Sequence, residues 1–344
     1  MTLDGLLSEA VTRRASDLHV SVGVEPVIRV DGDVVRIGDD LPLASEQVEA
    51  MLRDVMTADQ YDRFTREREC DFSLEMRDGH RCRVNAYQQV RGAAAAFRLI
   101  PPCVRTLDDL QCPDVIRQLV DRPKGLVLVT GQTGAGKSTT LAAVVDHLNR
   151  SRPFHIITIE DPVEVIHASA RSVINQREVG RHTRSFSAAL RSALREDPDC
   201  ILVGELRDRE TIQLALTAAE TGHLVLATLH TNSAPHTLDR MIDVFPAEEK
   251  AFARAMLAEC LTAVVCQTLV KRRAGVGRVA AWEVMVCVPA IRNLIREGKT
   301  AQIYSVMQTG SEYGMFTMQQ CLSAMRKDGL IDGPDETIST QFSS

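Results

Sequence analysis

Residues 127–143 constrain this chain more than any other stretch, because they read as a buried strand, a glycine-rich loop and a helix in immediate succession. The loop, residues 131–138, matches the pattern G-x-x-x-x-G-K-[ST] in full. Gly131, Gly134 and Gly136 let the backbone turn so that successive N–H groups face one anion, and the following helix adds the positive end of its dipole. The sequence therefore predicts a phosphate-binding loop.

Two side chains of this loop have predicted roles in binding a nucleotide. Lys137 is expected to reach the β- and γ-phosphates, and the hydroxyl of Ser138 is expected to complete the shell of a Mg²⁺ ion. We expect the loop residues Thr133, Ala135 and Thr139 to contact the nucleotide as well. ATP and Mg²⁺ are thus the predicted ligands of this region.

Length, charge and hydropathy narrow the class of protein. The chain has 344 residues, more than the about 250–300 at which single cores stop growing, so we expect two domains. Asp4 stands where a signal peptide would be positively charged, and no apolar run approaches the ~18–20 residues that span a bilayer, which predicts a cytoplasmic protein. The nine cysteines are never spaced C-x-x-C, which argues against zinc, and the net charge of −6 argues against nucleic-acid binding.

The first hundred residues predict a small α+β domain. Asp31-Gly32-Asp33 lies between two short apolar strands, which is a strong hairpin signal. Residues 45–68 read as a helix because apolar side chains recur at three- and four-residue spacing, and residues 80–100 read as two strands that turn at Arg91-Gly92. We assign residues 1–100 to an N-terminal domain, 101–112 to a linker, and 113–344 to a second domain.

The second domain predicts an α/β fold. Residues 156–159, 200–203 and 224–228 read as short apolar strands, and helical patterns separate them from one another. Strands that alternate with helices indicate a mostly parallel, doubly wound sheet. Ligands of such sheets gather at the carboxyl ends of the strands.

Acidic residues and a histidine follow these strands directly. The run ending in Glu164 follows the first strand, Glu205 follows the second, and His230 follows the third. Carboxylates can orient Mg²⁺ and polarise a water molecule, and a histidine can reach a γ-phosphate, so this set suits nucleotide hydrolysis. Most P-loop enzymes have Asp at the end of the second strand, and Glu205 serves better as the base that activates water than as a metal ligand.

Several motifs together resemble the secretion ATPases of type II secretion and type IV pilus systems. They are EDPVE at 160–164, SALREDPD at 192–199, VGELRD at 203–208, AAETGH at 218–223 and TLHT at 228–231, which correspond to the Asp box, Walker B and His box of that family. AIRNLIRE at 290–297 resembles a signature of the pilus retraction ATPases within it, and ASDLH at 15–19 and VDGD at 30–33 also match. The resemblance covers nearly the whole chain.

This resemblance implies an N-terminal PAS-like domain, a RecA-like P-loop domain and specific roles for their residues. It implies that Glu164 and Glu205 position or activate water, and that His230 senses the γ-phosphate with support from His223. Arg83 and Arg98 resemble N-terminal arginines that neutralise phosphate charge, and these six residues complete the predicted site. Gln132 and Ala135 replace the Pro and Ser that are common in relatives, but neither change removes a phosphate ligand.

The resemblance also implies partners and a cellular place. We expect a homohexamer at the cytoplasmic face of the inner membrane, where contact with the membrane runs through a platform protein and the pilus machinery. The motor would depolymerise pilin and drive twitching motility. Alternatives are an accessory retraction paralogue, an assembly or secretion ATPase, which usually carries a paired C-x-x-C metal site absent here, and a nucleic-acid translocase.

The signature at 290–297 predicts an amphipathic helix. Ile291, Leu294 and Ile295 fall on one face, and Arg292 and Arg296 lie off that face. We expect the two arginines to be exposed and the helix to transmit motion of the motor to the pilus machinery.

Overall fold

The structure is a computed structural model of the chain, and it describes residues 2–30, 32–37, 41–76, 79–100, 104–275 and 277–332. The chain divides into two compact units. Residues 1–103 and 162–165 form the first unit, and residues 104–161 and 166–344 form the second.

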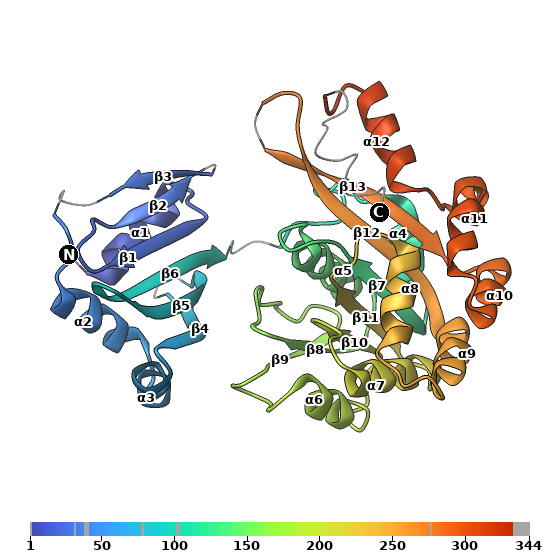
Figure 1. The fold of residues 1–344 in the computed structure, drawn as a ribbon, viewed down its shortest axis with the longest axis horizontal. Coiled ribbons are helices and arrows are strands. Elements are labelled where there is room, and N and C mark those ends of the chain that lie inside the picture. The colour runs from blue at the N-terminus through green and yellow to red at the C-terminus, as the bar shows by residue number, and fades with distance from the viewer. Residues whose placement is uncertain are drawn as a thin grey trace. The chain divides into compact units, whose positions relative to one another are not determined.

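The first unit is an antiparallel sheet with helices (Figure 1). Its elements are α1 (Leu3–Thr12), β1 (Asp17–Ser21), β2 (Val27–Val30), β3 (Asp33–Arg36), α2 (Ser45–Val55), α3 (Ala58–Glu67), β4 (Glu69–Glu75), β5 (Arg81–Gln89) and β6 (Gly92–Ile100). The strand order is β3-β2-β1-β6-β5-β4. Leu18, Val84 and Phe97 lie in register on one face of the sheet and share a core with the three helices.

Local signals decide two details of this unit. The predicted hairpin is confirmed, because β2 pairs with β3 up to Val30 opposite Asp33, while Asp31 lies outside the described residues. The single helix expected over residues 45–68 is wrong. Thr57 caps a second helix, since its hydroxyl accepts from the N–H of Gln60 and its N–H donates to the Gln60 side chain.

The second unit is built on a mostly parallel sheet. Its first elements are α4 (Asp114–Val120), β7 (Gly125–Thr130), α5 (Lys137–Ser151), β8 (His155–Glu160), β9 (Val173–Glu178), α6 (Phe186–Ala193), β10 (Cys200–Val203), α7 (Arg209–Glu220) and β11 (Leu224–Leu229). They are followed by α8 (Ala234–Asp243), α9 (Lys250–Cys260), β12 (Leu261–Lys271), β13 (Arg278–Val286), α10 (Pro289–Glu297), η1 (Thr300–Gln302), α11 (Ile303–Thr309), η2 (Ser311–Tyr313) and α12 (Met318–Lys327).

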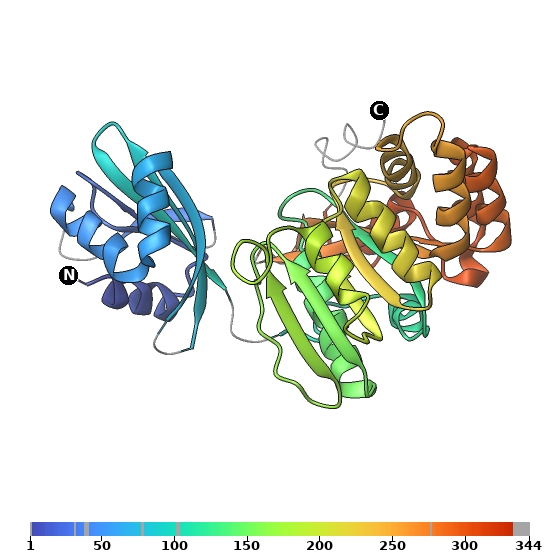
Figure 2. The same cartoon turned by 90° about the horizontal axis from the view of Figure 1, so that it is seen from below.

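The strand order of this sheet is β13-β12-β7-β11-β10-β8-β9, and only β13 runs antiparallel to its neighbour within the described sheet. Strands β7, β10 and β11 are buried along their whole length, as expected for parallel strands covered on both faces. Figure 2 shows helices against this sheet from a second direction. The predicted fold class, a small α+β domain followed by an α/β P-loop domain, is confirmed.

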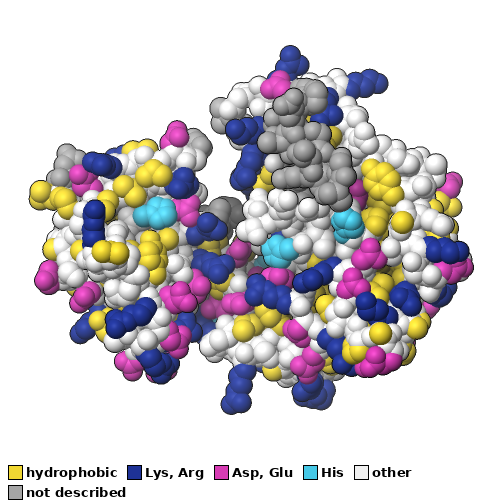
Figure 3. Space-filling view, viewed as in Figure 1, with side chains coloured by type: hydrophobic (Ala, Val, Ile, Leu, Met, Phe, Trp, Pro, Cys, Tyr) yellow, Lys and Arg dark blue, Asp and Glu magenta, His cyan; other side chains and the backbone are white. Residues whose placement is uncertain are grey.

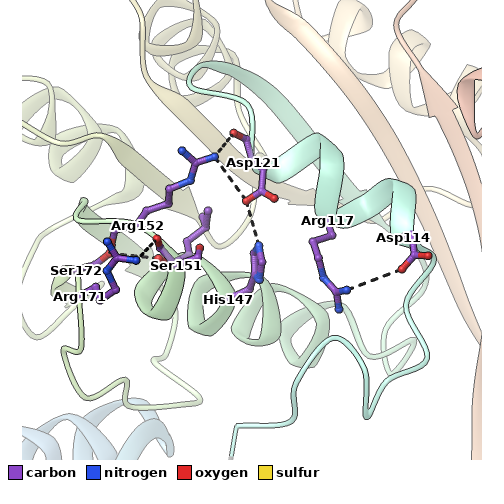
Figure 4. A network of polar contacts seen from close by, with 9 residues as sticks. Asp114, Arg117, Asp121, His147, Ser151, Arg152, Arg171 and Ser172 are labelled. Carbon is purple, nitrogen blue, oxygen red and sulfur yellow. Dashed lines mark hydrogen bonds and ion pairs between the residues drawn. The ribbon is translucent and has the colours of Figure 1, made fainter.

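Polar contacts anchor the far end of α5, the helix that follows the phosphate loop (Figure 4). Asp121, at the end of α4, lies 3.1 Å from Nε2 of His147 on α5, and its backbone carbonyl accepts from Arg152 at 3.0 Å. These contacts hold the C-terminal part of α5 against the end of α4.

The C-terminal signature forms α10 as predicted, but one of its arginines is not simply exposed. Arg292 is half-buried and donates to the backbone carbonyls of Ala258 and Glu259, the latter at 2.6 Å, at the end of α9. These two carbonyls lie in the last turn of α9, where no N–H group of the same helix can donate to them. Arg292 therefore caps the C-terminal end of α9. Arg296 is exposed and pairs with the Glu259 carboxylate at 3.3 Å.

The surface carries mixed charge. Figure 3 shows acidic and basic side chains interspersed on the visible face of each unit, with hydrophobic side chains scattered between them. Across the part of the chain that the structure describes, no helix has the length and apolar character required to cross a membrane.

Candidate active site

Strand register brings the predicted motifs to one edge of the parallel sheet. Thr130, the last residue of β7, lies opposite Leu229 of β11 on one side and Cys266 of β12 on the other. The phosphate loop that follows Thr130 is therefore flanked by His230 and by Gln267. This edge is the one at which ligands of parallel α/β sheets bind.

Two of the loop glycines, Gly131 and Gly136, leave no room for a side chain. A Cβ on Gly131, which has φ of +149°, would lie 2.3 Å from the backbone carbonyl oxygen of Gln267. A Cβ on Gly136, with φ of +88°, would lie 2.9 Å from the Gln267 side-chain nitrogen. The same Gln267 side chain accepts from the Thr140 hydroxyl of α5 at 2.7 Å. Gln267 thus packs the loop from the β12 side, a contact that sequence reasoning missed.

Lys137 lies inside the curve of the loop. Its ammonium donates to the carbonyl oxygens of Gly131 at 2.7 Å and of Gln132 at 3.1 Å, and it lies 3.4 Å from Nδ1 of His230. Only 8% of the residue is exposed. The charge of Lys137 is therefore held at the place where the loop would receive phosphate.

Glu205 faces His230 and Arg207. One carboxylate oxygen lies 2.7 Å from the Arg207 guanidinium, and the other lies 3.4 Å from Nε2 of His230. Burial raises the pKa of Glu205, but Arg207 and His230 outweigh it, so the pKa lies below its ordinary value. The carboxylate is consequently ionised at neutral pH and able to accept a proton.

The backbone after β10 is guided toward β11. The N–H of Leu206 donates to the carbonyl of Thr228 at 3.0 Å, and the Thr228 hydroxyl donates to the carbonyl of Gly204. A Cβ on Gly204 would lie 3.1 Å from the Ile159 carbonyl, so a larger residue there would press on β8. These contacts set Glu205 beside the end of β11, where His230 follows.

An open cavity of about 620 Å³ lies at this point. Its lining residues are Gln132, Thr133, Glu205, Arg207 and His230. Arg207 was absent from the predicted site, although its place two residues after Glu205 was a usable signal. The cavity combines two residues of the phosphate loop with a carboxylate, a histidine and a guanidinium, and the Lys137 ammonium lies 3.4 Å from that histidine. This set suits a phosphorylated ligand.

The remaining loop residues lie close to these groups. Thr133, Gly134, Ser138 and Thr139 are exposed, and Ala135 is buried. The described residues contain no cluster of three or more His, Cys, Asp or Glu side chains able to hold a metal ion. The donor set present, a hydroxyl at the start of α5, fits Mg²⁺, which keeps several waters and binds through substrate phosphates.

The structure does not bring His223 to this edge. It precedes β11, where its carbonyl accepts from the N–H of Gly125 at the start of β7. Strand β11 spans Leu224–Leu229, so the seven residue steps from His223 to His230 cover roughly 23 Å at about 3.3 Å per residue. The His223 ring bonds locally to the carbonyl of Ala218 at 2.9 Å.

Three predicted residues belong to the first unit. Arg83 on β5 and Arg98 on β6 lie directly opposite each other in the register, and Arg98 pairs with Asp17 at 3.1 Å. Glu164 lies in the segment 162–165 that groups with this unit. Their part in the site stays a prediction.

Comparison with known proteins places the chain in a family. Residues 1–326 match the family described as type II/IV secretion system protein. The chain belongs to this family. Its members are ATPases, and this chain is an ATP hydrolase that binds nucleotide, as the motifs predicted.

Within this family, the chain is similar to ATPases of type IV pili. The chain is 56% identical to the type IV pilus retraction ATPase PilT of Pseudomonas aeruginosa over 96% of both chains, and 39% identical to the type IV pilus ATPase PilU of the same organism, over 97% of this chain and 87% of PilU. A crystal structure of the pilus retraction motor PilT with bound ADP matches with a TM-score of 0.90 at 41% identity, covering 98% of both chains. These findings confirm the resemblance to pilus retraction ATPases.

Proposed function

We propose that this chain is a homohexameric motor ATPase that retracts type IV pili by depolymerising pilin, and so drives twitching motility. One observation carries the proposal: His230, which lines the cavity beside Glu205, faces both Glu205 and Lys137, in a chain 56% identical to a pilus retraction ATPase. The motor acts at the cytoplasmic face of the inner membrane. It associates with the membrane through a platform protein and the pilus machinery.

The contacts at the cavity support a division of roles. Lys137 exchanges the carbonyls of Gly131 and Gln132 for β- and γ-phosphate oxygens. Glu205 accepts a proton from water as the water oxygen bonds to the γ-phosphorus and the bond to the β,γ-bridging oxygen breaks, which releases ADP. His230, whose ring nitrogens face Lys137 and Glu205, contacts the γ-phosphate.

A Mg²⁺ ion supplies neutralisation of phosphate charge when it is bound. Ser138 would hold it together with phosphate oxygens and water. Thr133, Gly134, Ala135, Gly136 and Thr139 complete the proposed nucleotide contacts. His223 is not included, because it lies at the opposite edge of the sheet in its own chain.

The first unit is proposed to be a PAS-like domain that contributes charge to phosphates. Arg83 and Arg98 stand directly opposite each other on neighbouring strands, an arrangement that repels unless an anion lies nearby. Asp17 neutralises one of them. We assign Glu164 to orienting the attacking water, and we keep 101–112 as the linker between domains.

A deletion strain tests retraction against the alternatives. We expect cells that lack this protein to carry excess surface pili and to lose twitching, with both restored by the wild-type chain but not by Lys137→Ala. Bald cells would instead indicate an assembly ATPase. Normal twitching would indicate an accessory role. The higher identity to PilT (56%) than to PilU (39%) argues against that role. Stimulation of the ATPase by DNA would indicate a translocase.

A further inference from the structure

Glu283 is a buried carboxylate outside the cavity. It lies on β13 with 2% of its surface exposed. One oxygen accepts from the backbone N–H of Ala234 at 2.8 Å, and the other accepts from the backbone N–H of Met318 at 3.2 Å. Ala234 and Met318 are the first residues of α8 and α12, so these N–H groups have no acceptor within their own helices.

The environment of Glu283 allows it to tie the two helices together. The pKa of Glu283 lies above its ordinary value, because burial outweighs the opposing effects of the N–H groups of Ala234 and Met318, the thiol of Cys266 and His236. Burial also keeps the Cys266 thiol protonated by raising its pKa, so it can donate to the carboxylate. The positive ends of two helix dipoles therefore meet at one acidic side chain.

The contact at Ala234 continues to the catalytic histidine. Ala234 follows His230 by four residues, and the intervening turn is fixed by Thr237, which is fully buried. The Thr237 hydroxyl lies 2.7 Å from the Thr231 hydroxyl and donates to the carbonyl of Ser233 at 2.7 Å. The start of α8 thus determines where the loop with His230 lies.

We propose that Glu283 is a positioning residue for ATP hydrolysis, whose carboxylate ties the start of α8 to the start of α12 and so fixes His230 at the cavity. This inference rests on the proposed contact between His230 and the γ-phosphate. Glu283 would thereby link α12 to the loop that carries His230, because the starts of α8 and α12 both donate to its side chain.

Glu283→Gln tests the tie, since the amide keeps the shape but offers one acceptor oxygen to two N–H groups. We expect kcat of the full-length protein to fall by about 10- to 100-fold, as misplacement of a reacting group does, while the Kd of ADP, which lacks a γ-phosphate, stays within about 2-fold. Asp146→Asn is the matched control, because Asp146 is also a buried carboxylate but pairs with Arg150 in the third turn of α5. Its kcat should match the wild type.

A double-substitution cycle separates this inference from the proposed function. If Glu283 acts through His230, Glu283→Gln should lower kcat no further in a His230→Ala background. The inference is overturned if Glu283→Gln has wild-type kcat, or if its full effect persists without His230. The proposed role of His230 fails separately, if His230→Ala itself hydrolyses ATP at the wild-type rate.

A second pair of variants covers the outcome in which Glu283→Gln does not fold. Met318→Pro removes the N–H donor, and proline suits this position because Met318 is the first helical residue and Thr317 before it is extended. Met318→Ala loses the same side-chain packing but keeps the donor. We expect kcat of the proline variant to be several-fold below that of the alanine variant, and equal values would contradict the link to α12.

Discussion

Gly131→Ala should damage the phosphate loop through a contact that can be measured. The added Cβ would lie 2.3 Å from the carbonyl oxygen of Gln267, which belongs to the buried strand β12 and cannot rotate away. Alanine at φ of +149° adds backbone strain of about 1–3 kcal/mol. Forcing the backbone apart adds about 1–3 kcal/mol more, as overpacking does in other cores. The expected loss is therefore about 2–6 kcal/mol.

Gly134→Ala provides the matched control. Gly134 has φ of +79°, but nothing lies within 4 Å of a Cβ built there, so the cost is about 1–2 kcal/mol for the left-handed conformation alone. Thermal and urea unfolding of both full-length variants would measure the difference, and ADP titration would report the state of the loop. Equal unfolding midpoints for the two variants would refute the reasoning, because it attributes the difference to Gln267.

Three further predictions concern charge. Lys137→Ala should keep the fold and abolish ATP hydrolysis, and a folded variant with wild-type turnover in a coupled ATPase assay would contradict this. Arg207→Ala should move the acid limb of the ATPase rate to higher pH, because burial, which raises the pKa of Glu205, would no longer be opposed by the guanidinium; an unchanged pH profile would show that the ion pair is idle. Arg296→Ala should impair twitching with the ATPase rate unchanged, whereas Arg292→Ala should also lower the unfolding midpoint. A proportional loss of ATPase rate and motility in Arg296→Ala would show that α10 only supports the structure.

The sequence predicted the elements whose signals are local. The phosphate loop, the strand ends at Glu205 and His230, and the α/β class all follow from short patterns, and the topology confirms that Glu205 and His230 meet. What could not be predicted depends on partners far along the chain. Gln267 reaches the loop only because β12 pairs with β7, and Arg292 caps α9 only because α10 packs beside it.

His223 shows the limit of proximity in sequence. It stands seven residues before His230, but a buried parallel strand lies between them, so the two rings lie at opposite edges of the sheet. The helix expected over residues 45–68 failed for a related reason. The apolar spacing that predicted it runs only from Val48 to Met56, so it held no information on the segment after Thr57, where a cap starts a second helix.

The central claim is that Glu205 activates water at a site where Lys137 and the loop bind ATP. Glu205→Gln tests it most directly, because the amide keeps the shape and removes the base. Nucleotide affinity and steady-state ATPase rate, measured on one preparation, should show unchanged binding and a turnover lower by roughly 10²–10⁴-fold. Loss of nucleotide binding would make Glu205 a metal ligand, and unchanged turnover would place the base elsewhere; either result contradicts the claim.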